Sequence, residues 1–192
     1  MHLPANATLI VIDVQVGFDA AYWGERNNPG AEQTIARLLT RWRESRRPVI
    51  HVRHDSTEPE SALRPDGPGN AIKREAAPRP GEPVIGKRVN SAFIGTDLEA
   101  RLKAQDSDTV VLCGFTTNHC VSTTARMASN LGFRTFILSD GTVAFAMKSP
   151  GGRLIPATEM HEVGMAELQG EFATIVTTDE LFALMIPTGS EL

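Results

Sequence analysis

The sequence predicts an α/β fold in which a mostly parallel sheet is covered by helices on both faces. Short apolar runs alternate along the chain with longer amphipathic stretches, which is the pattern of such a sheet. The 192 residues are 41% hydrophobic and 22% charged, a balance typical of a globular protein that can build one substantial core. We see no internal repeat and no low-complexity tract, so we expect residues 1–192 to form a single domain.

Six apolar runs are predicted to be the strands of the sheet, at residues 8–14, 48–54, 82–86, 108–114, 133–139 and 171–177. Helical periodicity lies between and after them, at residues 31–46, 96–105, 117–131, 157–169 and 179–186. Thr96 and Glu99 have the spacing of a capping box, which predicts that the second helix begins at Thr96. The tail at residues 187–192 is predicted to be frayed.

One long segment, residues 56–83, breaks this alternation. It contains six of the twelve prolines and three glycines, and it has neither helical nor strand periodicity. Long loops inside a compact domain are often lids or binding loops, so the segment is predicted to close over a site or to reach a neighbouring subunit. The alternative is a tolerated surface insertion.

Charge and hydropathy exclude several classes of partner. The chain has 19 Lys and Arg against 23 Asp and Glu, a net charge of -4, which argues against nucleic acid or an anionic membrane as the main partner. No apolar run approaches the length of a membrane span, and the N-terminus lacks the pattern of a secretory signal. We therefore expect a cytoplasmic protein, in which the two cysteines, Cys113 and Cys120, are free thiols.

Three polar residues follow predicted strands and draw attention to one edge of the sheet. Asp13 ends the first apolar run, Lys87 follows the third, and Cys120 comes six residues after the Gly114 that closes the fourth. Ligands of open parallel sheets bind beyond the carboxyl ends of the strands. The sequence therefore predicts that the three side chains converge on one site.

Cysteine chemistry gives each of these residues a role in cleaving an acyl bond. A thiol near a helix start and a lysine is favoured as the thiolate nucleophile, Asp13 would carry its proton, and Lys87 would hold Asp13. Backbone N–H groups of Thr116 and Cys120 would stabilise the oxyanion of the tetrahedral intermediate. Taken singly, Cys120 also fits a buried apolar residue, Asp13 a turn cap and Lys87 a solvated side chain.

Three stretches of the chain resemble the isochorismatase-like cysteine hydrolase superfamily: LIVIDVQVGF at 9–18, GKRVNSAFIGTDL at 86–98 and GFTTNHCVSTTAR at 114–126. The resemblance implies a Rossmann-like three-layer α/β/α sandwich with six mostly parallel strands, commonly a homo-oligomer (a dimer or a tetramer). It implies a catalytic triad of Asp13, Lys87 and Cys120. It also implies a cis peptide bond between Phe115 and Thr116, which would aim the Thr116 N–H at the oxyanion.

The chain differs from two groups of the superfamily, and these differences narrow the activity that the resemblance implies. Nicotinamidases have an Asp-x-His metal motif where this chain has HVRHDS at residues 51–56. His51 and His54 are three positions apart on a predicted strand and point to opposite faces, so we expect no catalytic metal and no cofactor. True isochorismatases typically lack the cysteine. Cys120 therefore favours hydrolysis of a small amide or ureide through a thioester, as in carbamoylsarcosine amidase and in maleamate, ureidoacrylate and streptothricin hydrolases.

Several residues near the triad are predicted to touch the substrate, which we expect to be a small molecule. These are Gln15, Phe18, Trp23, Asn90, Phe93, Asn118 and His119. His119 is alternatively a hydrogen-bonded bystander, because the triad already contains a base. Arg53 and His54 are candidates for meeting an anionic substrate group, Cys113 is predicted to be core, and His161 is predicted to lie at the surface.

Two other functions remain compatible with these residues. One is cleavage of the isochorismate vinyl ether, with Cys120 incidental to the reaction. The other is a thiol redox sensor in which Cys113 resolves an oxidised Cys120. A nucleotide-binding module is disfavoured, because no Gly-x-Gly-x-x-Gly or phosphate loop follows the first strand.

Overall fold

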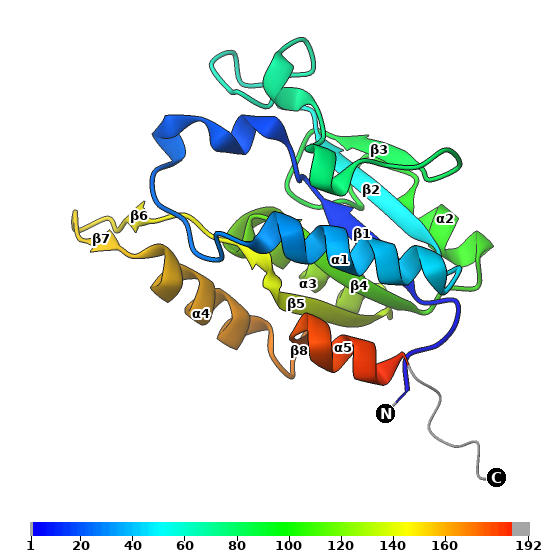
Figure 1. Ribbon diagram of the computed structural model, residues 1–192. Coiled ribbons are helices and arrows are strands. Elements are labelled where there is room, and N and C mark those ends of the chain that lie inside the picture. The colour runs from blue at the N-terminus through cyan, green and yellow to red at the C-terminus, as the bar shows by residue number, and fades with distance from the viewer. Residues whose placement is uncertain (1, 186–192) are drawn as a thin grey trace, which may run out of the picture.

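The protein is a parallel six-stranded sheet covered on both faces by helices (Figure 1). This computed structural model describes residues 2–185. All neighbouring strands of the sheet are parallel, in the order β3-β2-β1-β4-β5-β8. Their bounds are β1 Thr8–Ile12, β2 Val49–His54, β3 Val84–Lys87, β4 Thr109–Phe115, β5 Arg134–Val143 and β8 Thr174–Val176. The predicted α/β class and the six predicted strands are confirmed.

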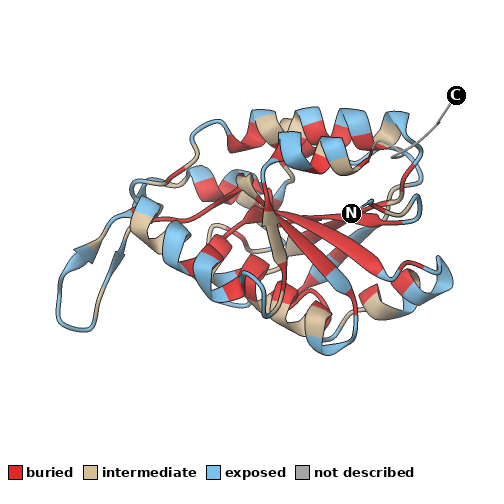
Figure 2. Ribbon diagram, turned by 90° about the horizontal axis from the view of Figure 1, so that it is seen from below, coloured by how far each residue is buried: buried red, intermediate tan, exposed pale blue. Residues whose placement is uncertain are grey.

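The helices form the two outer layers. Helices α1 (Ala31–Glu44) and α5 (Thr178–Leu184) pack on one face of the sheet, and α2 (Leu98–Ala104), α3 (Ser122–Asn130) and α4 (Ala157–Leu168) on the other. Figure 2 shows the strands buried between these layers and each helix with one buried and one exposed side. This division follows from the amphipathic stretches of the sequence, whose apolar stripes face the sheet.

The predicted helix at residues 117–131 is present: its first turn, Thr117–Val121, is a π-helix that continues directly into α3, which ends at Asn130. One other helix starts differently from the prediction. The predicted capping box at Thr96 is wrong: the Thr96 hydroxyl oxygen accepts from the N–H of Leu98 (3.3 Å) rather than from that of Glu99, and α2 begins at Leu98. A capping box is formed instead at the start of α5, between Thr177 and Glu180. The predicted end of that helix at residue 186 and the predicted frayed tail lie outside the described residues.

The proline-rich segment 56–83 packs against the chain that follows β1. It contains two short 3-10 turns, Pro68–Asn70 and Arg74–Ala76. Val16 N–H donates to the carbonyl of Ala71 (2.9 Å), and Lys73 N–H donates to that of Val14 (2.8 Å). These bonds bring the loop to the carboxyl edge of the sheet, where a lid would have to lie. Whether it acts as a lid or as a subunit contact stays a prediction.

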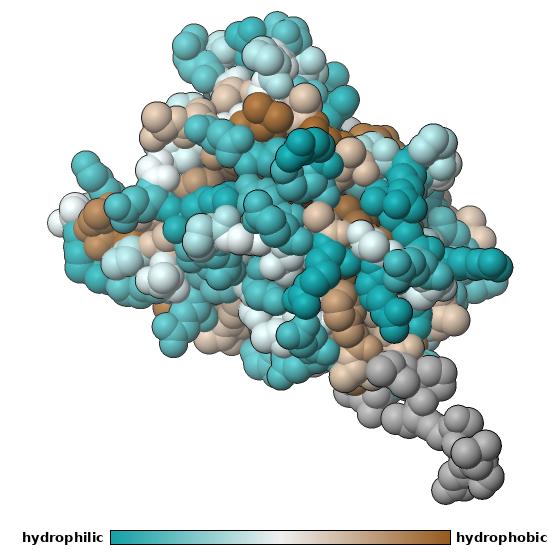
Figure 3. All heavy atoms as spheres, in the orientation of Figure 1, coloured by the Kyte–Doolittle hydropathy of each residue, from teal (hydrophilic) through white to brown (hydrophobic). Residues whose placement is uncertain are grey.

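A small antiparallel hairpin, β6 (Met147–Lys148) with β7 (Leu154–Ile155), projects from the body beyond β5 (Figures 1 and 2). It was not predicted, since two-residue strands give no periodic signal. The face drawn in Figure 3 is mostly hydrophilic, with an apolar spot over this hairpin, where Leu154 is 60% exposed. Among the described residues, none of the helices combines the length and the apolar character needed to cross a bilayer.

Candidate active site

The site forms where the strand order of the sheet reverses, between the neighbouring strands β1 and β4. Connections leave β1 in one direction and β4 in the other, which opens a crevice beyond the strand ends. Strands β1 and β4 approach so closely that a Cβ at Gly114 would stand 2.0 Å from the carbonyl oxygen of Ile12. Gly114 also has a φ of +119°, a conformation that glycine adopts without cost. Only glycine therefore fits at this position of β4.

The structure brings Asp13, Lys87 and Cys120 together at this crevice. The Lys87 ammonium lies 2.7 Å from Asp13 Oδ2, 3.2 Å from Cys120 Sγ and 3.1 Å from His54 Nδ1. The side chains of Lys87 and Asp13 are 0% exposed. An ammonium group has three N–H donors, and here three acceptors surround it, so this buried charge is fully hydrogen-bonded.

Asp13 keeps one carboxylate oxygen free of the lysine. Its Oδ1 is buried and has no hydrogen-bond partner among the described residues. Ligand atoms of Asp13, His54 and Cys120 all lie within 4.8 Å of one another, so the carboxylate is near the sulfur. Burial raises the pKa of Asp13, while the adjacent Lys87 ammonium works in the opposite direction. The carboxyl group is thus a stronger base than an exposed aspartate.

Cys120 sits in the π-helical turn Thr117–Val121 that leads into α3, at the helix start as predicted, with 8% of its surface exposed. Burial is the main cause that raises the pKa of the thiol to about 12, and the charge of Asp13 is the second. The Lys87 ammonium offsets this rise only in part. The expectation of a thiolate prepared by the helix start and the lysine is therefore wrong. The resting group is a protonated thiol, which requires a base before it can attack.

The turn that carries Cys120 begins at a cis peptide bond between Phe115 and Thr116, at the position that the family resemblance implied. The Thr116 carbonyl accepts from the N–H groups of His119 (3.2 Å) and Val121 (3.1 Å). In contrast, the Thr116 N–H has no acceptor within residues 2–185. It is therefore available to a ligand next to the thiol.

His54 is a site residue that the sequence reasoning left outside the triad. It ends β2, which lies between β1 and β3, and it pairs in register with Lys87. Because Lys87 donates to Nδ1, the ring carries its proton on Nε2 and is neutral. Burial and the lysine charge lower the pKa of His54 accordingly. His51 points away, with its Nε2 3.0 Å from Glu82 Oε2.

A cavity of about 300 Å³ opens onto the thiol, and we call it the catalytic cavity. Its lining is mostly apolar beside the reactive groups: Asp13, Phe18, Trp23, His54, Leu63, Asn90, Thr116, His119 and Cys120. Four of the predicted substrate contacts, Phe18, Trp23, Asn90 and His119, are in this list. Leu63, which the sequence did not single out, comes from the segment 56–83, so that segment does reach the cavity.

Two predicted substrate contacts are not among the lining residues. Gln15 is fully buried, and its amide donates to the carbonyls of His54 and Asn70 (3.0 Å each), which ties β2 to the loop. Phe93 is buried in the apolar layer and stacks on Phe133, with ring centroids 5.9 Å apart.

The remaining candidates take three different positions. Asn118 lines an adjoining cavity. Cys113 lies in the core, as predicted, with no exposed surface. His161 is not a surface residue: it is half-buried, and its Nδ1 lies 2.9 Å from Thr117 Oγ1. Arg53 pairs with Asp55 (2.9 Å) and does not line either cavity.

Asp13, His54 and Cys120 are the kinds of side chain that bind metals, but their arrangement does not fit a cation. The Lys87 ammonium already lies at hydrogen-bond distance from all three. A metal ion bound by the same atoms would have to displace this positive charge. The lysine therefore occupies the role that a cation would take.

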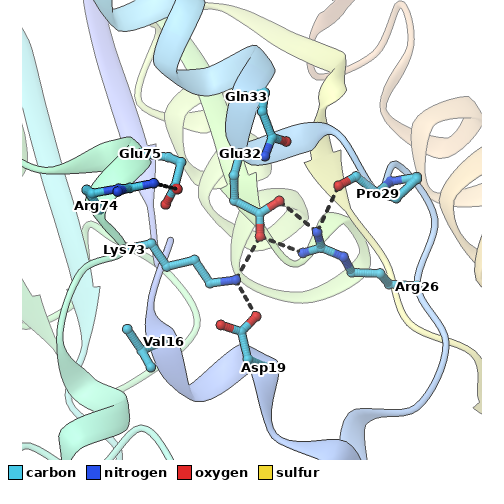
Figure 4. A pocket seen from close by; sticks show the side chains of 9 residues that line it. All are labelled: Val16, Asp19, Arg26, Pro29, Glu32, Gln33, Lys73, Arg74 and Glu75. Carbon is cyan, nitrogen blue, oxygen red and sulfur yellow. Dashed lines mark hydrogen bonds and ion pairs between the residues drawn. The ribbon is translucent and has the colours of Figure 1, made fainter.

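Figure 4 shows a cluster of charged side chains, Asp19, Arg26, Glu32 and Lys73, that point toward one another. Glu32 accepts two hydrogen bonds from the Arg26 guanidinium (2.8 and 2.7 Å) and one from Lys73 (2.7 Å). Lys73 also donates to Asp19 (2.5 Å). The cationic groups of Arg26 and Lys73 each lie 5.5 Å from the centre of the Phe115 ring. The cluster thus holds the residue that precedes Thr116.

Comparison with known proteins agrees with this fold and site. The family model described as the Isochorismatase domain matches residues 7–180. The isochorismatase family protein YrdC of Bacillus subtilis is 48% identical over 180 residues, covering 94% of this chain and 96% of that protein. A solved structure of an isochorismatase-family protein from Chromobacterium violaceum is 45% identical, covers 96% of each chain and superimposes with a TM-score of 0.91. The chain is a hydrolase with an α/β fold, and it belongs to the isochorismatase family.

Two further relatives have names that state an activity. Streptothricin hydrolase of Streptomyces noursei is 31% identical over 140 residues, covering 71% of this chain and 49% of that protein. Maleamate amidohydrolase of Pseudomonas putida is 32% identical over 110 residues, covering 57% and 46%. The family therefore includes amidohydrolases.

Proposed function

We propose that this protein is a metal-independent cysteine hydrolase that cleaves the C–N bond of a small amide or ureide through a thioester on Cys120. The observation that carries the proposal is the Lys87 ammonium, which contacts both Asp13 Oδ2 and Cys120 Sγ, two groups that line one small cavity. Relatives named as a maleamate amidohydrolase and a streptothricin hydrolase support the same class of reaction.

Acylation begins with transfer of the Cys120 thiol proton to Asp13. The sulfur attacks the amide carbon, and the carbonyl oxygen becomes an oxyanion beside the N–H groups of Thr116 and Cys120. Each such donor is worth about 3 kcal/mol in comparable acyl-transfer sites. Asp13 then returns the proton to the leaving nitrogen, the C–N bond breaks, and a thioester and a free amine or ammonia remain.

Deacylation uses the same groups in reverse. A water molecule attacks the thioester carbon while Asp13 takes its proton, and the C–S bond breaks to release a carboxylic acid. Asp13 then reprotonates the sulfur, which restores the neutral thiol. The raised pKa of the carboxyl group suits this shuttle, because a base works best when its pKa approaches the operating pH. Lys87 keeps its proton throughout and holds Asp13 and the sulfur in place.

The test is a panel of small amides, ureides and isochorismate, assayed for ammonia or product release by the wild type and by Cys120→Ala. We expect ammonia release from at least one amide or ureide and its loss in the variant. Isochorismate cleavage that survives Cys120→Ala would instead establish the vinyl ether reaction. Phe93→Leu serves as a matched control, because Phe93 is equally buried and lies outside the cavity lining.

A redox role for the two cysteines gains no support from their positions. Cys113 is buried within β4, and burial together with the charge of Asp140 raises the pKa of its thiol. A resolving thiol must be ionised and within reach of its partner. Thiol mapping after mild peroxide tests this alternative, and a Cys113–Cys120 disulfide would establish it.

The proposal also includes the domain organisation, the location and the oligomeric state of the chain. We propose that residues 1–192 act as a single domain, in the cytoplasm, as a dimer or tetramer. Light scattering of the purified protein measures the oligomeric state. Limited proteolysis measures the number of folded units, for which one protected fragment is expected.

A further inference from the structure

A second cavity of about 280 Å³ adjoins the catalytic cavity, and we call it the side cavity. It shares Trp23, Thr116 and His119 with the catalytic cavity. A ligand whose carbonyl group lies at Thr116 and Cys120 therefore has two directions in which its remaining atoms can extend. The side cavity is lined by Tyr22, Trp23, Thr116, Asn118, His119, Phe145, Ala146 and Met147.

The wall between the two cavities is aromatic. The ring of Trp23 lies 5.0 Å from that of Tyr22, 5.3 Å from that of Phe145 and 5.0 Å from that of Phe18. Its indole N–H donates to the carbonyl of Gly17 (3.0 Å), which fixes the orientation of the ring. Aromatic rings at these separations provide a planar apolar surface on which a ligand ring can stack.

Neither cavity offers a positive charge to a ligand. No lysine or arginine is among the described residues that line them. The Lys87 ammonium beneath the catalytic cavity has all three of its N–H groups engaged. Burial lowers the pKa of both histidines in the lining, His54 and His119, which leaves them neutral near pH 7. A substrate carboxylate here would stay unpaired, and burying an unpaired charge is strongly unfavourable.

We infer that the substrate is an uncharged amide with an aromatic or other planar apolar arm that lies in the side cavity, on the rings of Tyr22, Trp23 and Phe145. The inference rests on the proposed function for the position of the reacting carbonyl. It separates this chain from enzymes that act on anionic amides. It also disfavours isochorismate, which carries two carboxylates, as the substrate of this site.

Matched pairs of amides test the inference. The wild type is assayed for ammonia release from 4-acetylbenzamide and from 4-carbamoylbenzoate, which have similar size and differ in charge. We expect kcat/KM to be at least about tenfold higher for the neutral compound. Met147→Lys places a cation at the rim of the side cavity and is expected to reduce this preference. A wild-type preference for the anionic amide would overturn the inference and leave the proposed function intact.

A second comparison locates the arm. Tyr22 is 62% exposed, so Tyr22→Ala leaves the core unchanged. The variant is expected to raise KM for 4-acetylbenzamide several-fold, by about the value of one stacked ring pair, and to leave acetamide unaffected. The half-buried Phe172, which lies on neither cavity, gives the matched control Phe172→Ala. An equal effect of Tyr22→Ala on acetamide would contradict the assignment of the side cavity.

Binding to Cys120→Ala separates failure of the inference from failure of the proposed function. Binding is measured by the quenching of tryptophan fluorescence. Of the two tryptophans, Trp23 lines both cavities and Trp42 is fully buried elsewhere. Quenching that is lost in Trp23→Phe therefore reports binding at the site. Tighter binding of 4-acetylbenzamide than of 4-carbamoylbenzoate supports the inference even if the wild type hydrolyses neither. Equal binding of the two, or tighter binding of the anion, overturns it.

Discussion

Replacing Glu32 by Gln tests the charged cluster behind Phe115. Glu32 is buried, and its bonds to Arg26 and Lys73 outweigh the effect of burial and lower the pKa of the carboxyl to about 2 from an ordinary 4.5. This difference corresponds to about 3 kcal/mol of folding free energy that the ionised carboxylate supplies. Because the folded-state pKa is the lower one, this stabilisation is fully present above pH 4.5 and is lost as the pH falls through 2.

Urea denaturation at several pH values is the assay. At about pH 7, Glu32→Gln is expected to lower the free energy of unfolding by about 3 kcal/mol, since a buried pair loses one partner. By about pH 3 the difference from the wild type is expected to narrow to about 1 kcal/mol. Glu99→Gln, which removes an exposed pair with Lys103, is the control and should change stability by less than about 0.5 kcal/mol. A loss below about 1 kcal/mol at neutral pH, or a difference independent of pH, would refute the reasoning.

Three further predictions concern the thiol and its base. Asp13→Asn is expected to lower the pKa of Cys120 from about 12, because the carboxylate charge is removed while the Lys87 charge stays. The absorbance of the thiolate as a function of pH, with Cys120→Ala as the blank, measures this pKa. An unchanged midpoint of the titration would contradict the prediction. The value of kcat/KM is expected to fall on acidification as Asp13 becomes protonated. The midpoint of this fall is expected above pH 3.8, because the pKa of Asp13 is raised. A midpoint at or below pH 3.8 would indicate that another group is the base. His54→Ala is expected to lower kcat about tenfold with little change in KM, because Lys87 loses one hydrogen-bond acceptor. His54→Asn is expected to recover kcat. An equal loss of kcat in both variants would indicate a different role for His54.

The convergence of the site was predictable because it depends on a general property of parallel sheets. Asp13, Lys87 and the turn before Cys120 each follow a strand, and the carboxyl ends of parallel strands share one edge. The order of the strands was not predictable from one sequence. His54 was a candidate for substrate contact, but its place beside Lys87 was missed for this reason: it ends β2, the strand next to those of Asp13 and Lys87. A prediction of strand order would have placed it next to Lys87.

Other misses arose from tertiary burial and local backbone geometry. The state of the thiol was wrongly predicted because the sequence shows the helix start and the lysine but not the desolvation of the sulfur. Gln15 points away from the cavity because Asp13 adopts a φ of +52° and the chain turns sharply after it. Thr96 has the spacing of a capping box with Glu99, yet its hydroxyl donates to the carbonyl of Ala92 and accepts from the N–H of Leu98 instead. Spacing alone does not reveal such competing partners.

Trapping the acyl-enzyme tests the central claim, that the sulfur of Cys120 forms a covalent bond to the substrate. An amide that the wild type turns over is mixed with the enzyme, the reaction is quenched in acid, and the digested peptides are analysed by mass spectrometry. The account predicts the mass of the acyl group on the peptide that contains Cys120, no adduct in Cys120→Ala, and no ammonia release by that variant. Ammonia release by Cys120→Ala at the wild-type rate, or an acyl group on a different residue, would contradict it.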